Sequence, residues 1–215
     1  MLTTVAAAAL ALTLQPSADP NARPRNEDVP PITVNVYAAR GVSPHLVTET
    51  LNEAGAVWND VGITLAWRVV VDSQPQYTAA PHVVIADETA QSGNSTQTPI
   101  GWVRFRHPDD PDQEIHISRR NGMKLLRSYA GLGRPVERMP PGEVDVTLGR
   151  VLGRALAHEL GHFLLRSSTH TSRGLMRGNH TIREFVAIGR RGFEVDATQR
   201  AAVAARIREM TGADT

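Results

Sequence analysis

The sequence contains no cysteine among its 215 residues. This absence excludes disulfide bonds and thiolate metal sites, so the fold must depend on its core and on any metal held by other ligands. An excess of one charge is also missing, because 23 Lys and Arg residues stand against 22 Asp and Glu residues. Without a basic surplus or an acidic run, we expect no nucleic-acid partner and no charged tail.

Long hydrophobic runs are scarce as well. The apolar run from Val5 to Leu14 is too short to span a bilayer. The small residues that follow it suit signal-peptide cleavage, although no Lys or Arg precedes the run. We therefore predict a possible signal peptide at 1–18 and a linker at 19–31 that is rich in Pro and charge. The protein would then be secreted or periplasmic, with no integral membrane segment in the mature chain. It would be cytoplasmic if residues 1–18 are not a leader.

Residues 32–215 suffice for one domain with a sizeable core. Alternating or β-branched patterns predict strands at 32–37, 63–71, 82–86, 100–105 and 114–118, the last a polar strand at a sheet edge. Helical spacing predicts helices from Pro44 to Gly62 and from Thr147 to Leu165, and a capping box opens a last helix at Asp196. The segments 119–144 and 166–195 are expected to be mostly loop. This order predicts an α+β domain in which a twisted mixed sheet packs with an N-terminal, a central and a C-terminal helix.

The predicted central helix carries the motif that points to chemistry, His158-Glu159-Leu160-Gly161-His162. Histidines four residues apart lie on one face of a helix, so both imidazoles can bind one ion. Glu159 stands beside them, where it can hold a water molecule bound to that ion. The pattern is typical of zinc hydrolases, and of peptidases above all.

A catalytic zinc site usually has three protein ligands and one open position. Candidates for the third ligand are His170, His180, Glu184 and Glu194. We favour His170, which follows His162 by eight residues and is close enough for the chain to turn back under the metal. Glu184, on a downstream helix, and His180 remain open alternatives.

Residues 158–176 resemble the metzincin clan of zinc peptidases. That clan shows H-E-x-x-H-x-x-G-x-x-H, followed by a turn with a methionine beneath the metal. The resemblance implies a zincin-like domain with His158, His162 and His170 as Zn²⁺ ligands, Glu159 as general base and Met176 as the turn methionine. The chain departs from the clan at Leu165 and Ser168, where the glycine and the third histidine would fall, so its turn is two residues longer. A rival gluzincin-like site would use Glu184 as the third ligand.

These features predict a zinc-dependent peptidase, an endopeptidase, that acts as a monomer on peptide or protein substrates. An extended substrate could lie along 114–118, and either Tyr129 or His180 could donate to the oxyanion. We interpret the basic residues Arg119, Arg120 and Arg127 as a solvated loop, in preference to a surface that favours acidic substrates. Two alternatives stay open: a zinc-stabilised binding domain whose fourth ligand is His180, and a zinc amidase acting on a non-peptide amide.

Overall fold

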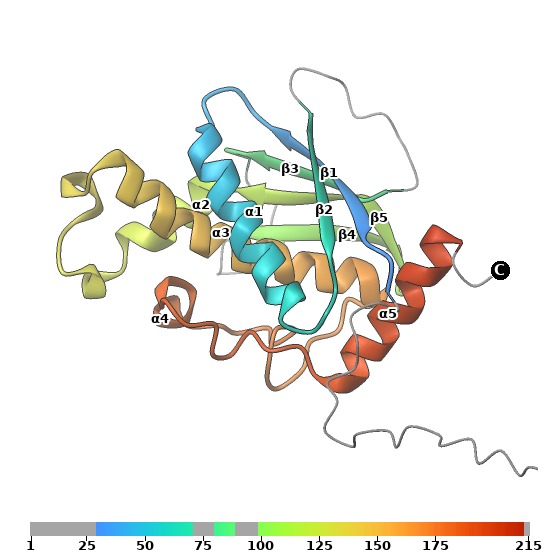
Figure 1. Ribbon diagram of the computed structural model, residues 1–215. Helices are drawn as coiled ribbons and strands as arrows, with labels where there is room; N and C mark the ends of the chain where they lie inside the picture. Colours follow the sequence, from blue (N-terminus) through green and yellow to red (C-terminus); the bar gives the residue numbers. More distant parts are fainter. Residues whose placement is uncertain (1–28, 71–79, 89–98, 213–215) are drawn as a thin grey trace, which may run out of the picture.

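The computed structural model describes residues 29–70, 80–88 and 99–212. The predicted leader and most of the predicted linker lie outside the described residues. Within them, a five-stranded sheet has the order β2-β1-β3-β5-β4 (Figure 1). The strands are β1 (Ile32–Ala38), β2 (Leu65–Val70), β3 (His82–Ala86), β4 (Gly101–His107) and β5 (Asp110–Ser118). The first four strands of that order are parallel, and β4 alone runs antiparallel, as the outer arm of a hairpin with β5.

The prediction that residues 114–118 form a sheet edge is wrong. Strand β5 begins at Asp110 and lies between β3 and β4, so the edge on this side of the sheet is β4. The polar residues that suggested an edge alternate with Ile115 and Ile117, which are buried. Because successive side chains point to opposite faces of a strand, Glu114 and His116 mark the solvent-facing side of an internal strand, whereas Ser118 is buried.

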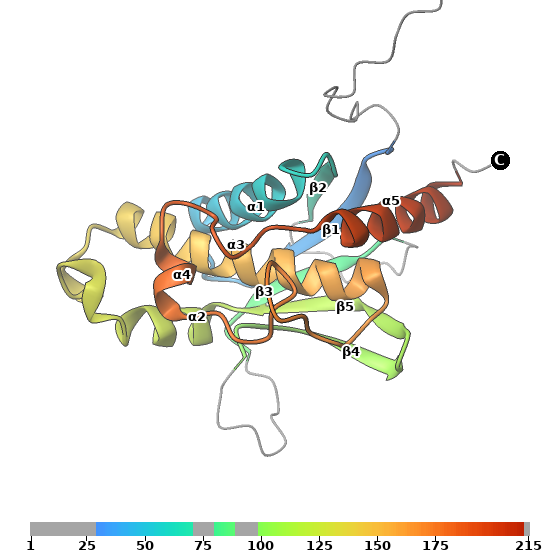
Figure 2. The same cartoon turned by 90° about the horizontal axis from the view of Figure 1, so that it is seen from below.

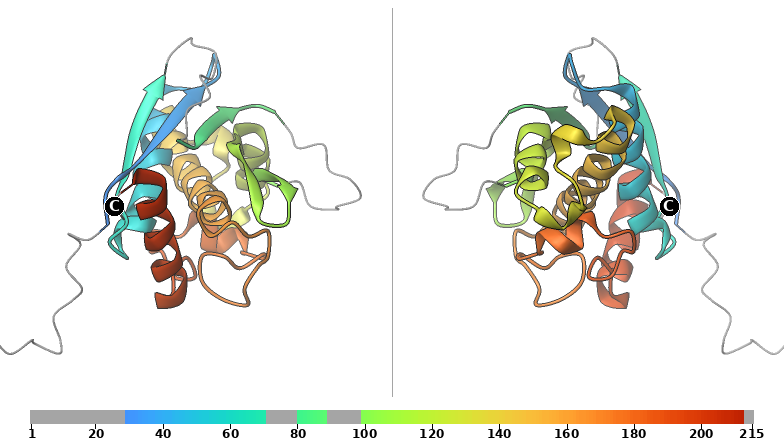
Figure 3. Two further views of the ribbon diagram at one scale, coloured as in Figure 1. Left: turned by 90° about the vertical axis from the view of Figure 1, so that its right-hand side faces the viewer. Right: turned by 90° about the vertical axis from the view of Figure 1, so that its left-hand side faces the viewer.

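The helices α1 (Pro44–Asn59) and α3 (Pro141–Leu165) pack against the other face of the sheet, and α5 (Ala197–Thr211) packs against α3 (Figures 1 and 3). Ser43 caps α1, and its hydroxyl accepts a hydrogen bond from the amide of Leu46 at 3.0 Å. A Cβ on Gly153 would lie 2.6 Å from the carbonyl oxygen of Thr50. The glycine therefore lets the backbones of α1 and α3 approach closely, and α3 lies against β5 and β4.

Two predicted loops contain further elements. The segment 119–144 holds helix α2 (Arg119–Arg127) and 3₁₀ turns at Ala130–Leu132 and Val136–Arg138. Helix α2 was missed because only its capping residue, Ser118, gives a clear sequence signal; its hydroxyl accepts from the amide of Asn121. The segment 166–195 holds the short helix α4 (Ile182–Val186). None of the described helices is long and apolar enough to cross a membrane.

Helix α3 begins six residues before the predicted start at Thr147. Proline at the first helical position, Pro141, starts it, and the hydroxyl of Thr147 instead bonds back to the carbonyl of Glu143. The predicted C-terminal end at Leu165 agrees with the structure, as does the capping box of α5 at Asp196. Figure 2 shows the chain after α3 passing back along that helix, with α2 and α4 beside its N-terminal half.

Candidate metal centre

The paired histidines of the motif lie on the last turns of α3, on the side that faces β4. Their positions four residues apart bring the two Nε2 atoms to 3.0 Å from each other. The ring of Phe105, on β4, packs edge-on against His162 with centroids 6.5 Å apart. The helix therefore supplies two converging nitrogens beside the edge strand.

The chain reverses after Leu165 and returns a third imidazole to the same point. Arg166 ends α3 in the left-handed conformation at φ 51°, the role that a glycine would fill at lower conformational cost. The Nε2 atom of His170 then lies 3.3 Å from the Nε2 atoms of both His158 and His162. Among the described residues, these three histidines form the one cluster able to hold a metal ion.

The spacing of the three nitrogens suits a tetrahedral metal. Ligands at a zinc–nitrogen distance of about 2.05 Å lie about 3.3 Å from one another along the edge of a tetrahedron. The observed separations are 3.0, 3.3 and 3.3 Å. The three residues therefore fit one zinc-sized ion without rearrangement.

The tautomers of the two helical histidines point their lone pairs at this centre. Carbonyl oxygens only accept, so Nδ1 of His158 donates to Leu175 at 2.7 Å and Nδ1 of His162 donates to Ser167 at 2.6 Å. Burial lowers the pKa of His158 to about 3 and also lowers the pKa of His162. Both rings are thus neutral near pH 7, with unprotonated Nε2 atoms. The lone pairs of these two Nε2 atoms repel each other at this distance unless a cation lies between them.

The turn that contains Met176 supports the site from below. Gly174 has φ +72°, and the amide of Leu175 donates to the carbonyl of Glu194 at 2.8 Å. This turn aims the Leu175 carbonyl at His158 and buries the Met176 thioether beneath α3, against Gly161. The turn therefore orients a histidine without contributing a ligand.

Glu159 is buried between α3 and the edge strand. A Cβ on Gly101 would lie 2.8 Å from the Cγ atom of Glu159, so the bare backbone of β4 gives the carboxylate room. The side chain is 9% exposed, and burial raises its pKa to about 8 against the opposing effect of a hydrogen bond from the backbone of Val103. In the metal-free protein, burial therefore favours the protonated form of this carboxyl group.

The other candidate ligands are engaged elsewhere. Glu184 accepts from the guanidinium of Arg177 at 2.6 Å and caps α4 through Thr181. His180 donates from Nε2 to Leu175 at 3.2 Å, while its Nδ1 accepts from Arg177 at 3.1 Å. The carboxylate of Glu194 accepts from the amide of Gly192. His170 is thus the residue that the described structure places with the helical pair.

A cleft of about 1060 Å³ opens over the three histidines and Glu159. Its walls come from β4, α2, α3 and the segment from 168 to 185. The contribution of α2 was missed from the sequence because that helix was not predicted. Tyr129, one of the two predicted oxyanion donors, does not line the cleft, whereas His180 does.

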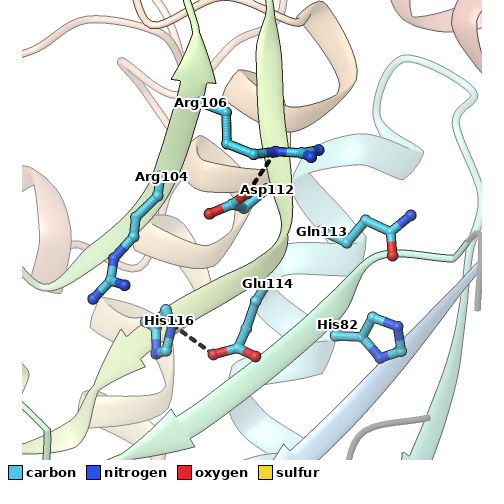
Figure 4. Close-up of a pocket in the computed structure, with 7 residues that line it drawn as sticks. All are labelled: His82, Arg104, Arg106, Asp112, Gln113, Glu114 and His116. Carbon is cyan, nitrogen blue, oxygen red and sulfur yellow. Dashed lines mark ion pairs between the residues drawn. The ribbon is translucent and has the colours of Figure 1, made fainter. Parts of the chain in front are cut away.

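A second hollow, of about 480 Å³, lies on the solvent-facing side of the sheet (Figure 4). Its acidic groups are paired with basic neighbours. Arg106 contacts Asp112 at 3.0 Å, and His116 contacts Glu114 at 2.8 Å. These residues form no metal-binding cluster in the part of the chain that the structure describes. The residues that could hold a metal ion therefore line the larger cleft.

No family model and no curated protein matches this chain. Among solved structures, it is similar to archaemetzincin from Methanopyrus kandleri, with a TM-score of 0.51 and 13% identity over 86% of this chain and 98% of that one. It is also similar to metalloproteinase-II from Bacteroides fragilis, with a TM-score of 0.50 and 12% identity over 85% of this chain and 54% of that one. At such identities the likeness is one of fold. The described residues form one α+β domain whose fold is similar to that of these two proteins.

Proposed function

We propose that this protein is a zinc-dependent peptidase of metzincin-like type. His158, His162 and His170 hold the metal, and Glu159 is the general base. The observation that carries the proposal is the convergence of three Nε2 atoms within 3.3 Å, with the Nδ1 atoms of the helical pair fixed by carbonyl groups. Such outer contacts orient ligands in zinc sites and raise their basicity.

When bound, zinc acidifies a water molecule and polarises the scissile carbonyl. The protein's own residues orient the reactants and transfer the proton. A Glu159 carboxylate oxygen accepts the proton of the attacking water and returns it to the nitrogen of the leaving amine. Burial, which raises the pKa of Glu159 in the metal-free protein, favours holding that proton between the two steps.

The edge strand suits an extended peptide. Strand β4 lies at the edge of the sheet. Its residue Gly101 lies next to Glu159, and its residue Phe105 contacts His162. A peptide that adds to β4 by backbone hydrogen bonds would cross both residues. The substrate strand proposed from the sequence therefore moves from β5 to β4.

The geometry favours catalysis over a closed structural site. The fourth ligand of such a site would be His180, but both of its ring nitrogens already have partners. A buried carboxylate at Glu159 would also have no role in a purely structural site. An amidase acting on a non-peptide amide would use the same residues, so substrate profiling separates it from a peptidase.

The test compares the purified protein with its Glu159→Gln variant. We expect one zinc ion per chain in both by mass spectrometry, and cleavage of a mixed peptide library by the parent alone. A metal-free parent would reject the proposal, as would a variant as active as the parent. Cleavage of a non-peptide amide but of no peptide would favour the amidase.

A further inference from the structure

Helix α2 turns one face toward the cleft. Three of its residues and its C-cap line the cleft at helical spacings of three and four: Asn121, Lys124, Leu125 and the cap Ser128. Ala155, one helical turn before Glu159, and Phe185 of α4 line the same end. This end of the cleft therefore combines apolar surface with the polar groups of α2.

Most polar groups on that face of α2 already have partners. The Asn121 amide donates to the carbonyl of Pro99 at 2.7 Å, and the Ser128 hydroxyl donates to the carbonyl of Leu125 at 2.7 Å. Within 29–70, 80–88 and 99–212, the ammonium group of Lys124 has neither a hydrogen bond nor an ion pair. It stands exposed at the wall of the cleft.

The cleft has little negative charge to meet this ammonium group. Glu159 is the sole carboxylate among the described residues that line it, and in the proposed function it works at the metal. The other strong cation of the lining, Arg177, is paired with Glu184 at 2.6 Å. The sequence of 89–98, next to the lining residue Pro99, contains no charged residue.

Lys124 differs from the other basic residues of its segment, which are either paired with a carboxylate or lie outside the cleft lining. Arg119 donates to Asp87 at 2.8 Å, and Arg127 donates to Glu137 at 3.0 Å. Arg120 does not line the cleft. The positive charge available to a bound substrate on this helix is therefore that of Lys124.

We propose that Lys124 is a specificity-determining residue that binds a carboxylate of the substrate. This inference rests on the proposed peptidase function. The carboxylate belongs either to an Asp or Glu side chain or to the C-terminus of the peptide. An ammonium group pairs with both as a point charge, and Leu125 and Phe185 offer apolar contact to the chain that carries the carboxylate.

The experiment uses the intact protein and quenched peptides in matched pairs. One series replaces Glu by Gln at each position around the cleaved bond, and the other compares a free with an amidated C-terminus. We expect the acidic member of one pair to have a kcat/KM about fivefold higher, mainly through KM, which is the upper end for an exposed ion pair. Salt at about 0.5 M should shrink this preference, because exposed charges are screened.

Lys124→Gln should abolish the preference and Lys124→Glu should reverse it. The control is Arg127→Gln, which removes the same charge from α2 outside the cleft and should keep the preference. A parent that cleaves both members of every pair equally overturns the inference, as does a preference that survives Lys124→Glu.

A binding assay separates this inference from the proposed function. Fluorescence anisotropy of the same labelled peptides on the Glu159→Gln variant, with and without Lys124→Glu, measures charge preference without turnover. If the parent cleaves no peptide, the proposed function fails. Tighter binding of the peptides that carry the extra carboxylate would still support the role of Lys124, provided that Lys124→Glu reverses this preference. Binding that does not depend on the charge of the peptide would overturn it.

Discussion

The sulfur of Met176 occupies the space that a side-chain Cβ at Gly161 would need. Gly161 lies on α3 between the two helical histidines, and Met176 lies in the turn that carries the Leu175 carbonyl. The missing side chain thus allows the turn to pack directly beneath the helix. This contact therefore positions the Leu175 carbonyl group that accepts the hydrogen bond from His158.

Gly161→Ala should therefore disturb both packing and metal binding. The added methyl group displaces Met176, which we expect to lower the free energy of unfolding by about 1–3 kcal/mol. Displacement of the Leu175 carbonyl should weaken zinc binding about 10- to 100-fold, as for other losses of a ligand's orienting partner. Urea denaturation and a competitive zinc titration measure the two effects.

The matched control for that substitution is Gly142→Ala on the same helix. A Cβ there would meet nothing within 4 Å, so the change should be neutral or slightly stabilising. Equal effects of the two substitutions would contradict the packing argument.

His170→Ala should reduce zinc affinity more than any change outside the three ligands. It removes one of three converging nitrogens, and the loss should exceed the about 100-fold upper range for an outer-contact substitution. Glu184→Gln is the control, because its carboxylate is occupied by Arg177 and Thr181. Isothermal titration with a competing chelator distinguishes them, and a greater loss in Glu184→Gln would indicate the gluzincin-like site.

Arg154 joins three parts of the fold, and its substitution should be strongly destabilising. Its side chain is fully buried, donates to Glu53 on α1 at 2.7 Å and to the carbonyl of Gly189 at 2.9 Å, and lies over the ring of Phe193. Arg154→Met leaves these acceptors short of a donor, so we expect a loss of about 3–5 kcal/mol.

The control for Arg154 is Arg206→Met, which removes an ion pair to Glu209 near the C-terminus. It should cost less than about 1 kcal/mol, as expected of a surface ion pair. Chemical denaturation followed by circular dichroism compares both variants with the parent. Similar small losses would show that the buried guanidinium contributes little.

Glu184 should make stability depend on pH in the acidic range. The hydrogen bond from Arg177 lowers the pKa of Glu184 to about 2 from an ordinary value of 4.5. A lowered carboxyl pKa stabilises the folded state above the unfolded value, and the benefit disappears as the pH falls toward the folded value. The parent should therefore exceed Glu184→Gln in stability at pH 6, and this difference should shrink between pH 4.5 and 2.

Urea midpoints of both proteins, measured at intervals of pH, give this difference directly. Denaturant slopes should be the same in the two proteins, so that midpoints report stability alone. A difference that stays constant down to the acid limit would show that the Arg177 contact does not hold the Glu184 pKa low.

The sequence alone determined the α+β class, the strand and helix order around the motif, and the two histidines with their neighbouring glutamate. These features are local: a spacing of four on a helix fixes His158 and His162, and alternation fixes strands such as 82–86, whose observed bounds are the same. The capping box at Asp196 likewise needs only the residues within one turn.

Tertiary structure decided the rest, because the remaining choices depend on contacts between distant residues. Strand order cannot be obtained from alternation, so the edge moved from β5 to β4 only when β3 paired with β5. His170, His180 and Glu184 all lie within reach along the chain, but among them only His170 joins His158 and His162 in a described cluster that could hold a metal ion. The same is true of Lys124, which became part of the cleft wall when α2 packed beside α3.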